Sequence, residues 1–440
     1  MGFSAVSLRK HWSAPVPAIA LASLLVGFAT PAPAVLPARP TPAIHATAVH
    51  ATAVHPTTSG TQFQCPPSWL GTTLTANPTV SADGRFVAFT GQSPDGDEGG
   101  TSVVLLRDTR LGVTFSVAQV TPAGRPYAPI ISDDGTRVAY LRNSPLGGRR
   151  DDLYVYDRRS GRTTHEGQAD VESALDFSAD GRYLTYWTAG TDEWDWSITP
   201  DVYVRDLDSD RTTLVSVSAD GGRGNGASIN PTISADGRYV LFSSQATNLP
   251  SGQDSLGYAI YLRDLVRHRT TVLRHAEDGS ILYQSEAQLS PDGRYVLYTG
   301  ERIYRYDRTT GRTLTLGPVP AEDRFVGAAR LSDHGRFVAY QTTFLVGGDL
   351  GDAFTELNVI NVKTGTEEQA NVGLDHNQPW TGAYFGALSP NGRYLTFYSD
   401  ATNLVPDDTN NAFDVFVRDL KSNRTLRASE ADPGPVGCTP

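Results

Sequence analysis

The chain has 440 residues, with 48 acidic side chains against 37 lysines and arginines, and its formal net charge is −11. A surface this acidic repels phosphate backbones, so we expect no nucleic-acid partner. The length exceeds what one core needs, which leaves several domains or one repeated architecture.

The first 34 residues predict a secretory signal peptide. Arg9 and Lys10 form a positive start, residues 18–29 form an apolar core, and a small-Pro-small tripeptide ends at Ala34. The core is short for a bilayer, so we predict cleavage after Ala34 and a secreted or periplasmic protein; an uncleaved anchor is the alternative. No later apolar run approaches membrane length, so no transmembrane segment is expected after signal removal.

Residues 35–62 are rich in Pro, Ala and Thr and contain the tandem HATAVHATAVHP. Such a composition cannot bury enough apolar surface to fold, so we predict a flexible linker. Its recurring histidines (His45, His50 and His55) leave a metal-binding tract as the alternative.

One nine-residue motif then recurs seven times. Its Asp-Gly turn becomes His-Gly at His334 and Asn-Gly at Asn391, and alternating aromatic and β-branched residues follow each turn. A glycine turn followed by such alternation predicts a β-hairpin, with the aspartates as turn formers. The copies begin at Ser81, Ser132, Ser178, Ser234, Ser290, Ser332 and Ser389.

A second motif follows each hairpin, for example DVYVRD at Asp201 and DVFVRD at Asp414, and a further strand-like run follows that. Four strands thus recur with a spacing of 42 to 57 residues. This period indicates an all-β fold, a seven-bladed β-propeller of four-stranded antiparallel blades over residues 63–440.

The pattern S-x-D-G-R-[FY]-[VL]-x-[FY] followed by D-V-[YF]-V-R-D resembles the repeat of the TolB-type (WD-repeat-like) propellers, and in particular secreted bacterial members. The resemblance implies a fold used by envelope scaffolds, peptidase caps and lyases. TolB itself resembles six blades behind an α/β domain, whereas here seven motifs follow a linker.

The loops opposite the Asp-Gly turns are acidic. The loop PDDTNNAFD offers side-chain oxygens at alternating positions, which is what calcium requires. We therefore predict a calcium site there, with a solvated acidic loop as the alternative. The predicted ligands are Asp407, Asp408, Asn410 and Asp414.

The residue two before each motif serine should face the central axis, because it alternates with a buried neighbour. Asp176 and Arg330 are the charged members of this set. They could pair across the channel, bind a ligand, or form a solvated wall. Asp176 with Glu172 or Glu286 is the one carboxylate pair that could serve a glycosidase or lyase, at a separation of about 5–10 Å.

Trp194 and Trp380 fall in ligand-face loops, where they could stack on sugars or close the loops. No G-x-S-x-G or H-E-x-x-H motif occurs, and the propeller histidines fall in different blades. We therefore expect a non-enzymatic module that binds or scaffolds a protein or glycan of the cell envelope. A carbohydrate-active enzyme and a purely structural envelope domain are the alternatives.

Cys65 and Cys438 flank the predicted ring at its two ends. A closed ring brings its first and last blades together, so we predict a disulfide bond between them in an exported monomer. Two free thiols or an intermolecular link are the alternatives.

Overall fold

The structure is a computed structural model. It describes residues 75–92, 102–120, 124–143, 150–170, 174–188, 199–250, 257–274, 281–282, 286–300, 302–319, 321, 323–346, 349–374 and 382–430. The chain divides into two compact units, Met1–Thr57 and Thr58–Pro440, and every described residue belongs to the second. The predicted signal peptide and linker lie outside the described residues.

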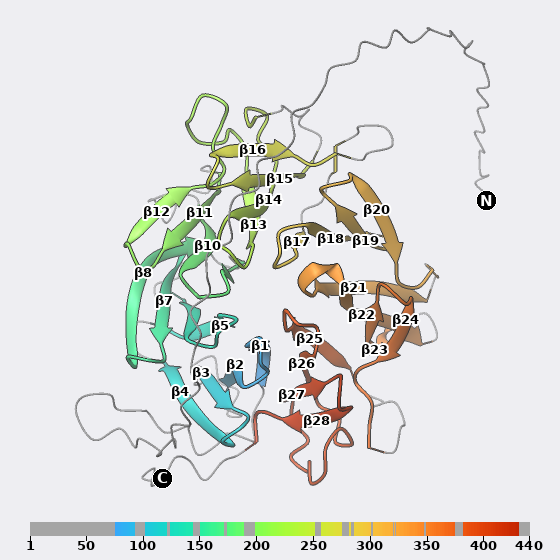
Figure 1. Cartoon of the computed structure of the whole chain (residues 1–440). Coiled ribbons are helices and arrows are strands. Elements are labelled where there is room, and N and C mark those ends of the chain that lie inside the picture. Colours follow the sequence, from blue (N-terminus) through green and yellow to red (C-terminus); the bar gives the residue numbers. More distant parts are fainter. Residues whose placement is uncertain are drawn as a thin grey trace, which may run out of the picture. The chain divides into compact units, whose positions relative to one another are not determined.

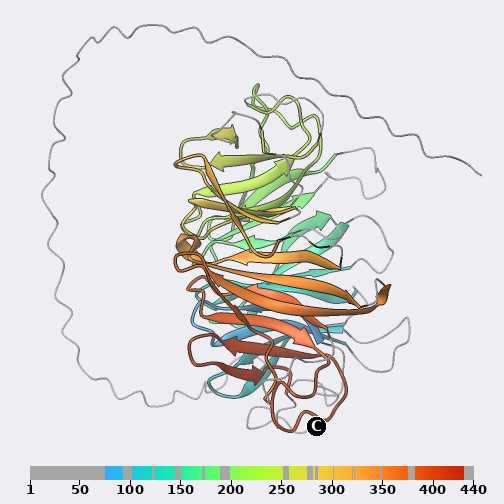
Figure 2. The same ribbon diagram turned by 90° about the vertical axis from the view of Figure 1, so that its right-hand side faces the viewer.

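Seven four-stranded antiparallel sheets surround a central axis, so the prediction of a seven-bladed β-propeller is confirmed. Each sheet uses four consecutive strands, and the first strand of a blade lies innermost (Figure 1). Figure 2 shows the ring edge-on, with the strands running between its two faces. Within the described part of the chain, no helix is long and apolar enough to span a membrane.

The strands of blades 1 to 4 are β1 (Thr75–Val80), β2 (Phe86–Gln92), β3 (Ser102–Asp108), β4 (Val113–Gln119); β5 (Pro126–Ile131), β6 (Arg137–Arg142), β7 (Arg150–Asp157), β8 (Arg162–Asp170); β9 (Asp176–Phe177), β10 (Tyr183–Thr188), β11 (Asp201–Asp206), β12 (Arg211–Leu214); β13 (Ser228–Ile233), β14 (Tyr239–Ser244), β15 (Ala259–Asp264) and β16 (Arg269–Val272). Those of blades 5 to 7, with one short 3-10 helix, are β17 (Ala287–Leu289), β18 (Tyr295–Thr299), β19 (Ile303–Asp307), β20 (Arg312–Leu316); β21 (Arg324–Leu331), η1 (Asp333–Gly335), β22 (Phe337–Val346), β23 (Asp349–Asn361), β24 (Thr366–Gln369); β25 (Ala383–Leu388), β26 (Tyr394–Ser399), β27 (Asp414–Asp419) and β28 (Arg424–Arg427).

The apolar core lies between the blades. Each of the seven buried clusters among the described residues joins two neighbouring sheets, because a single sheet cannot cover its own faces. The cluster between blades 7 and 1 packs Phe89 and Leu105 against Val415 and Val417. The ring therefore closes by side-by-side packing, without a strand shared between its first and last blades.

The repeated motif has a specific hydrogen-bonding role in each turn. In blade 1, the Ser81 hydroxyl donates to Asp83 (2.6 Å) and accepts the N–H of Phe86 (3.0 Å). Gly84 has a φ of 73°, and a Cβ at this position would lie 2.6 Å from the Tyr394 ring of blade 7. Glycine is thus required both by the turn and by the close approach of the neighbouring blade.

The motif arginine ties this turn to the end of the third strand. Arg85 pairs with Asp108 at 2.7 Å, and an arginine at the same motif position pairs with the terminal aspartate of the third strand in four other blades. The two sequence motifs therefore recur together because they form one ion pair. The four further pairs are Arg182–Asp206, Arg238–Asp264, Arg294–Asp307 and Arg393–Asp419.

Candidate functional site in the central channel

The axial side chains of three consecutive blades join each blade to the next. Asp176 accepts the N–H of Ile233 (2.8 Å) through its Oδ2 atom. Thr232 accepts the N–H of Leu289 (3.0 Å), and Gln288 that of Leu331 (2.9 Å). An acceptor two residues before the motif serine thus stabilises the contact between blades.

Arg330 occupies the same position in β21 but has no acceptor atom to offer. Its Nη1 donates to the Ala329 carbonyl (3.0 Å), and its guanidinium carbon lies 5.7 Å from the centre of the Phe385 ring in blade 7. Within the described part of the chain it has no carboxylate within 4 Å. Most of its five N–H donors are therefore available to a ligand in the channel.

The charged groups of the channel influence one another. Burial raises the pKa of Asp176 to about 7, although the Ile233 N–H and the positive charge of Arg330 oppose this rise. Burial lowers the pKa of Arg330, while Asp176 and Glu286 act to raise it. The charges of Asp176 in blade 3 and of Glu286 before blade 5 therefore act on Arg330, which also lies near an aromatic ring of blade 7. A side chain near the central axis can be this close to several blades.

The face that carries the glycine turns, here called the turn face, holds further carboxylates at the channel mouth. Asp133 and Asp333 each follow a motif serine, in blades 2 and 6. Burial raises the pKa of Asp133 to about 6, and the negative charges of Asp134 and Asp333 raise it further. Asp133, Asp134 and Asp333 therefore lie close enough at this mouth for their charges to act on one another.

Main-chain hydrogen bonds join neighbouring blades around this mouth. The contact between two neighbouring blades is here called a seam and is numbered by its blades. A main-chain bond crosses seams 1–2, 2–3, 3–4, 4–5 and 6–7, and each bond runs from a turn N–H to a turn carbonyl of the next blade. Pro291 and Pro390 have no N–H to donate into seams 5–6 and 7–1. The main-chain bonds are Ala82→Asp133 (2.8 Å), Asp134→Ala179 (3.1 Å), Ala179→Ala235 (3.0 Å), Ala235→Pro291 (2.7 Å) and Asp333→Pro390 (2.7 Å).

Side chains join the two proline seams. Asn391 donates from Nδ2 to the Ala82 carbonyl (2.5 Å) and so joins blade 7 to blade 1. The His334 ring pairs with Asp292 (2.8 Å) and joins blade 6 to blade 5. The His-Gly and Asn-Gly variants thus occur at the two seams where Pro291 or Pro390 has no main-chain N–H to donate, and their side chains supply the missing link.

The predicted calcium ligands of blade 7 lie around an arginine. The carboxylates of Asp408 and Asp414 lie 2.8 and 3.5 Å from Nη1 of Arg427. Asn410 donates to Asp414 (2.7 Å), whereas Asp407 is exposed. Three of the four predicted ligands are brought together, and Arg427 already supplies positive charge among them.

Asp414 is buried and also accepts from the Ser429 hydroxyl (2.5 Å). Burial raises its pKa to about 6, and bonds from Ser429 and Asn410 oppose the rise. Asp201 of blade 3 likewise accepts from Ser216 (2.6 Å) and pairs with an arginine, Arg223 (2.5 Å), which comes from a different position in the repeat. The Asp–Ser pair thus recurs in a blade without the predicted calcium loop, and calcium binding stays a prediction.

The remaining predicted site residues divide between exposed and undescribed positions. Glu286 is exposed just before β17, on the face opposite the turns. Glu172, Trp194 and Trp380 lie outside the described residues, as do both cysteines, Cys65 and Cys438.

Two groups of residues were missed from the sequence. Thr232 and Gln288 stand two residues before a motif serine, and their role as hydrogen-bond acceptors between blades was not predicted. The Asp292–His334 pair was signalled by a proline in one motif copy and a histidine in the next. Neither signal is recognisable without knowing which backbone groups meet between blades.

Comparison with known proteins supports the fold. No protein-family model and no curated protein sequence matches the chain. The β-propeller domain of the Trilobed protease from Pyrococcus furiosus is similar in structure, with a TM-score of 0.54 and 13% identity over 83% of this chain and 98% of that one. That domain is described as having an open velcro topology.

Two further solved structures are similar. An acylaminoacyl peptidase of Pyrococcus horikoshii matches with a TM-score of 0.53 and 14% identity over 82% of this chain, which spans about half (53%) of the peptidase. TolB from Acinetobacter baumannii matches with a TM-score of 0.41 and 18% identity, over 80% of this chain and 84% of that one. At these identities the likeness extends to the propeller fold alone.

Proposed function

We propose that this chain is a secreted or cell-envelope β-propeller that binds a protein or glycan partner over its central channel and catalyses no reaction. The observation that carries the proposal is Arg330, a guanidinium at the axis without an ion-pair partner among the described residues. The equivalent positions of the three preceding blades hold acceptors that clamp one blade to the next, a bond that the arginine cannot make.

An axial arginine suits recognition of an anionic group. A guanidinium presents planar, paired donors that match a carboxylate, such as that of a uronic acid or an acidic peptide. The surrounding carboxylates Asp176 and Glu286 disfavour a bare anion. They favour a ligand that also offers hydroxyl or amino donors, as sugars and peptides do. In this proposal the loop residues Glu172, Trp194 and Trp380 complete the contact surface.

The raised pKa of Asp176 favours a carbohydrate-active enzyme as the second candidate, because a carboxyl group that is partly protonated near neutral pH can act as a general acid. The shared geometry of Asp176, Thr232 and Gln288 argues for the binding module. A clamp made equally by a hydroxyl or an amide does not need acid–base chemistry.

The test is to screen the mature protein and its Arg330→Gln variant on a glycan array and against solubilised envelope proteins. Gln is the natural residue at this position in blade 5, so the fold should be retained. Arg312→Gln, on the exposed outer strand β20, is the matched control. We expect ligands whose binding is lost with Arg330→Gln and kept with Arg312→Gln.

Equal binding by all three proteins would contradict a channel site. Release of products from an acidic polysaccharide by the wild type, abolished in Asp176→Asn, would instead support the enzyme.

A further inference from the structure

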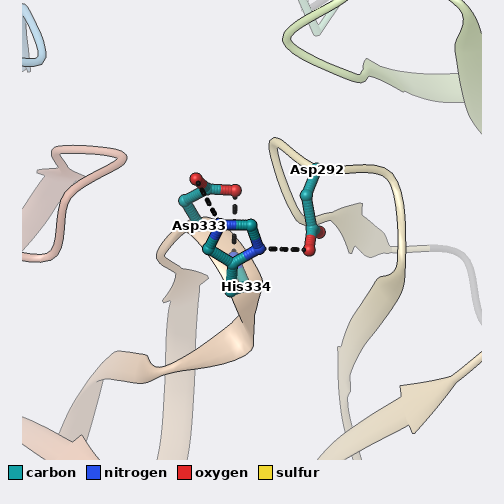
Figure 3. Close-up of side chains that lie close together, drawn as sticks. All are labelled: Asp292, Asp333 and His334. Carbon is teal, nitrogen blue, oxygen red and sulfur yellow. Dashed lines mark hydrogen bonds and ion pairs between the residues drawn. The ribbon is translucent and has the colours of Figure 1, made fainter. Parts of the chain in front are cut away.

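The seam between blades 5 and 6 gathers one imidazole and two carboxylates at the turn face (Figure 3). One ligand atom from each of Asp292, Asp333 and His334 lies within 4.8 Å of the others. The His334 Nδ1 atom is 2.8 Å from Asp292, and its Nε2 atom is 3.4 Å from Asp333. No other cluster of three such groups occurs in the described ranges.

The two carboxylates are already oriented by the turns that carry them. Oδ1 of Asp292 accepts from the Ser290 hydroxyl (2.5 Å) and from the N–H of Arg294 (3.1 Å), which leaves Oδ2 to face the imidazole. Oδ1 of Asp333 accepts the N–H of His334 (3.0 Å), and its Oδ2 faces the same ring. Each carboxylate thus has one oxygen held by its own turn and one available as a ligand.

The turn sets the backbone of His334, and its imidazole is open to solvent. His334 lies in the left-handed region, with a φ of 55°, within η1. Its side chain is 76% exposed, so water can complete a coordination shell. The negative charges of Asp133 and Asp333 at the channel mouth attract a cation to this place.

We propose that Asp292, Asp333 and His334 bind a divalent transition-metal ion, Zn²⁺ being the natural probe, which bridges blades 5 and 6. An imidazole with two carboxylates suits zinc better than calcium or magnesium, which prefer oxygen ligands alone. Ligand bonds of about 2.0–2.2 Å in a tetrahedral shell separate the ligand atoms by about 3.3 Å. The 2.8 Å gap between His334 Nδ1 and Asp292 therefore needs to open by about half an ångström. Because one ion coordinates one imidazole nitrogen and Asp333 faces Nε2, one carboxylate must also turn toward the nitrogen that the other faces, over a separation of at most 4.8 Å.

Zinc titration by isothermal calorimetry, with melting curves in parallel, tests the proposal on the full exported chain. His334→Asn is the informative variant, because Asn tolerates the left-handed backbone that His334 adopts (φ 55°) better than most residues do. His165→Asn is the control, since His165 is exposed and paired with the single carboxylate of Asp152 (3.2 Å).

We expect the wild type and His165→Asn to bind one more equivalent of Zn²⁺ than His334→Asn and Asp292→Asn do. Zinc should raise their melting temperature more than that of the two site variants. The linker histidines are common to all four proteins and cancel in the difference. Equal stoichiometry and equal zinc-dependent melting shifts in His334→Asn and the wild type would overturn the site.

Discussion

The seams between blades are of two kinds. Five are joined at the turn face by a main-chain N–H donated to the next blade. The other two, 5–6 and 7–1, have a proline at the donor position and are joined by side chains. A main-chain bond requires no particular side chain, so the turns of those five seams can be near-identical. A side-chain link requires His334 or Asn391, so the departures from the repeat identify the seams where the backbone cannot supply the bond.

The largest effect is expected at the seam between blades 7 and 1, which chain continuity does not tether. A Cys65–Cys438 disulfide bond would stabilise the ring by up to roughly 6 kcal/mol in the chain-entropy model. Non-reducing mass spectrometry of the exported protein should show a mass lower by two hydrogens than after reduction. Cys438→Ser should melt at a lower temperature, and two free thiols or a covalent dimer in the wild type would contradict the bond.

The axial clamp of blade 3 should have the next largest effect. Asp176→Ala leaves the N–H of Ile233 without its acceptor and should lower the free energy of unfolding by about 1–3 kcal/mol. Asp176→Thr, which copies the clamp of blade 4, should keep most of the stability. Urea unfolding measures both variants, and equal losses would show that the hydrogen bond is not the cause.

The same clamp makes stability depend on pH. Because burial raises the pKa of Asp176 to about 7, the folded protein holds this proton more tightly than the unfolded chain does. The free energy of unfolding therefore falls as pH rises from about 4 to about 7. Asp176→Thr should flatten that slope, and an unchanged slope would assign the pH dependence to other groups.

The Asn391 link can be separated from its turn. Asn391→Asp keeps the turn of the five Asp-Gly copies but removes the donor to Ala82, and it should lower the free energy of unfolding by about 1 kcal/mol. Adding Pro390→Ala restores a main-chain N–H and should recover the loss. Asp236→Asn, in the main-chain seam 4–5, should change stability by less than about 0.5 kcal/mol. If Pro390→Ala does not recover the lost stability, the Asn391 side-chain bond is not a replacement for the missing main-chain bond.

A smaller effect is expected from the protonation of His334. Its hydrogen bond to Asp292, with the charge of Asp333, raises the pKa of His334 above its ordinary value of 6.5. The seam is therefore strongest below pH 6.5 and weakens as pH rises through the higher, folded-state pKa. With chelator present, the melting temperature of the wild type should fall relative to that of His334→Asn over this range. A difference in melting temperature that stays constant with pH would show that protonation of His334 does not affect this seam.

The smallest effect is expected from calcium, because Arg427 already neutralises part of the charge of Asp408 and Asp414. If calcium binds among Asp407, Asp408, Asn410 and Asp414, chelator lowers the melting temperature and millimolar calcium restores it. Asp407→Asn would weaken that response without disturbing the Arg427 pairs. A melting curve unchanged by calcium would leave the loop as a structural ion pair.

The sequence by itself determined the fold. Seven copies of a Ser-x-Asp-Gly turn, each followed by an alternating strand and an Arg-Asp ending, specify a four-stranded blade through local hydrogen bonds and through one ion pair within the blade. These interactions connect residues close in sequence or at a constant offset, so repetition reveals them. The axial direction of Asp176 and Arg330 followed from strand alternation for the same reason.

The tertiary structure decided what the charged residues contact. The use of Asp176 as a clamp, the absence of a carboxylate partner for Arg330 among the described residues and the position of Arg427 beside Asp414 depend on atoms that meet only when neighbouring sheets pack or a loop folds back. His334 reaches Asp292 across 42 residues, and Asn391 reaches Ala82 across 309. A local pattern does not encode such contacts, because they are set by the rotation of one rigid blade against the next.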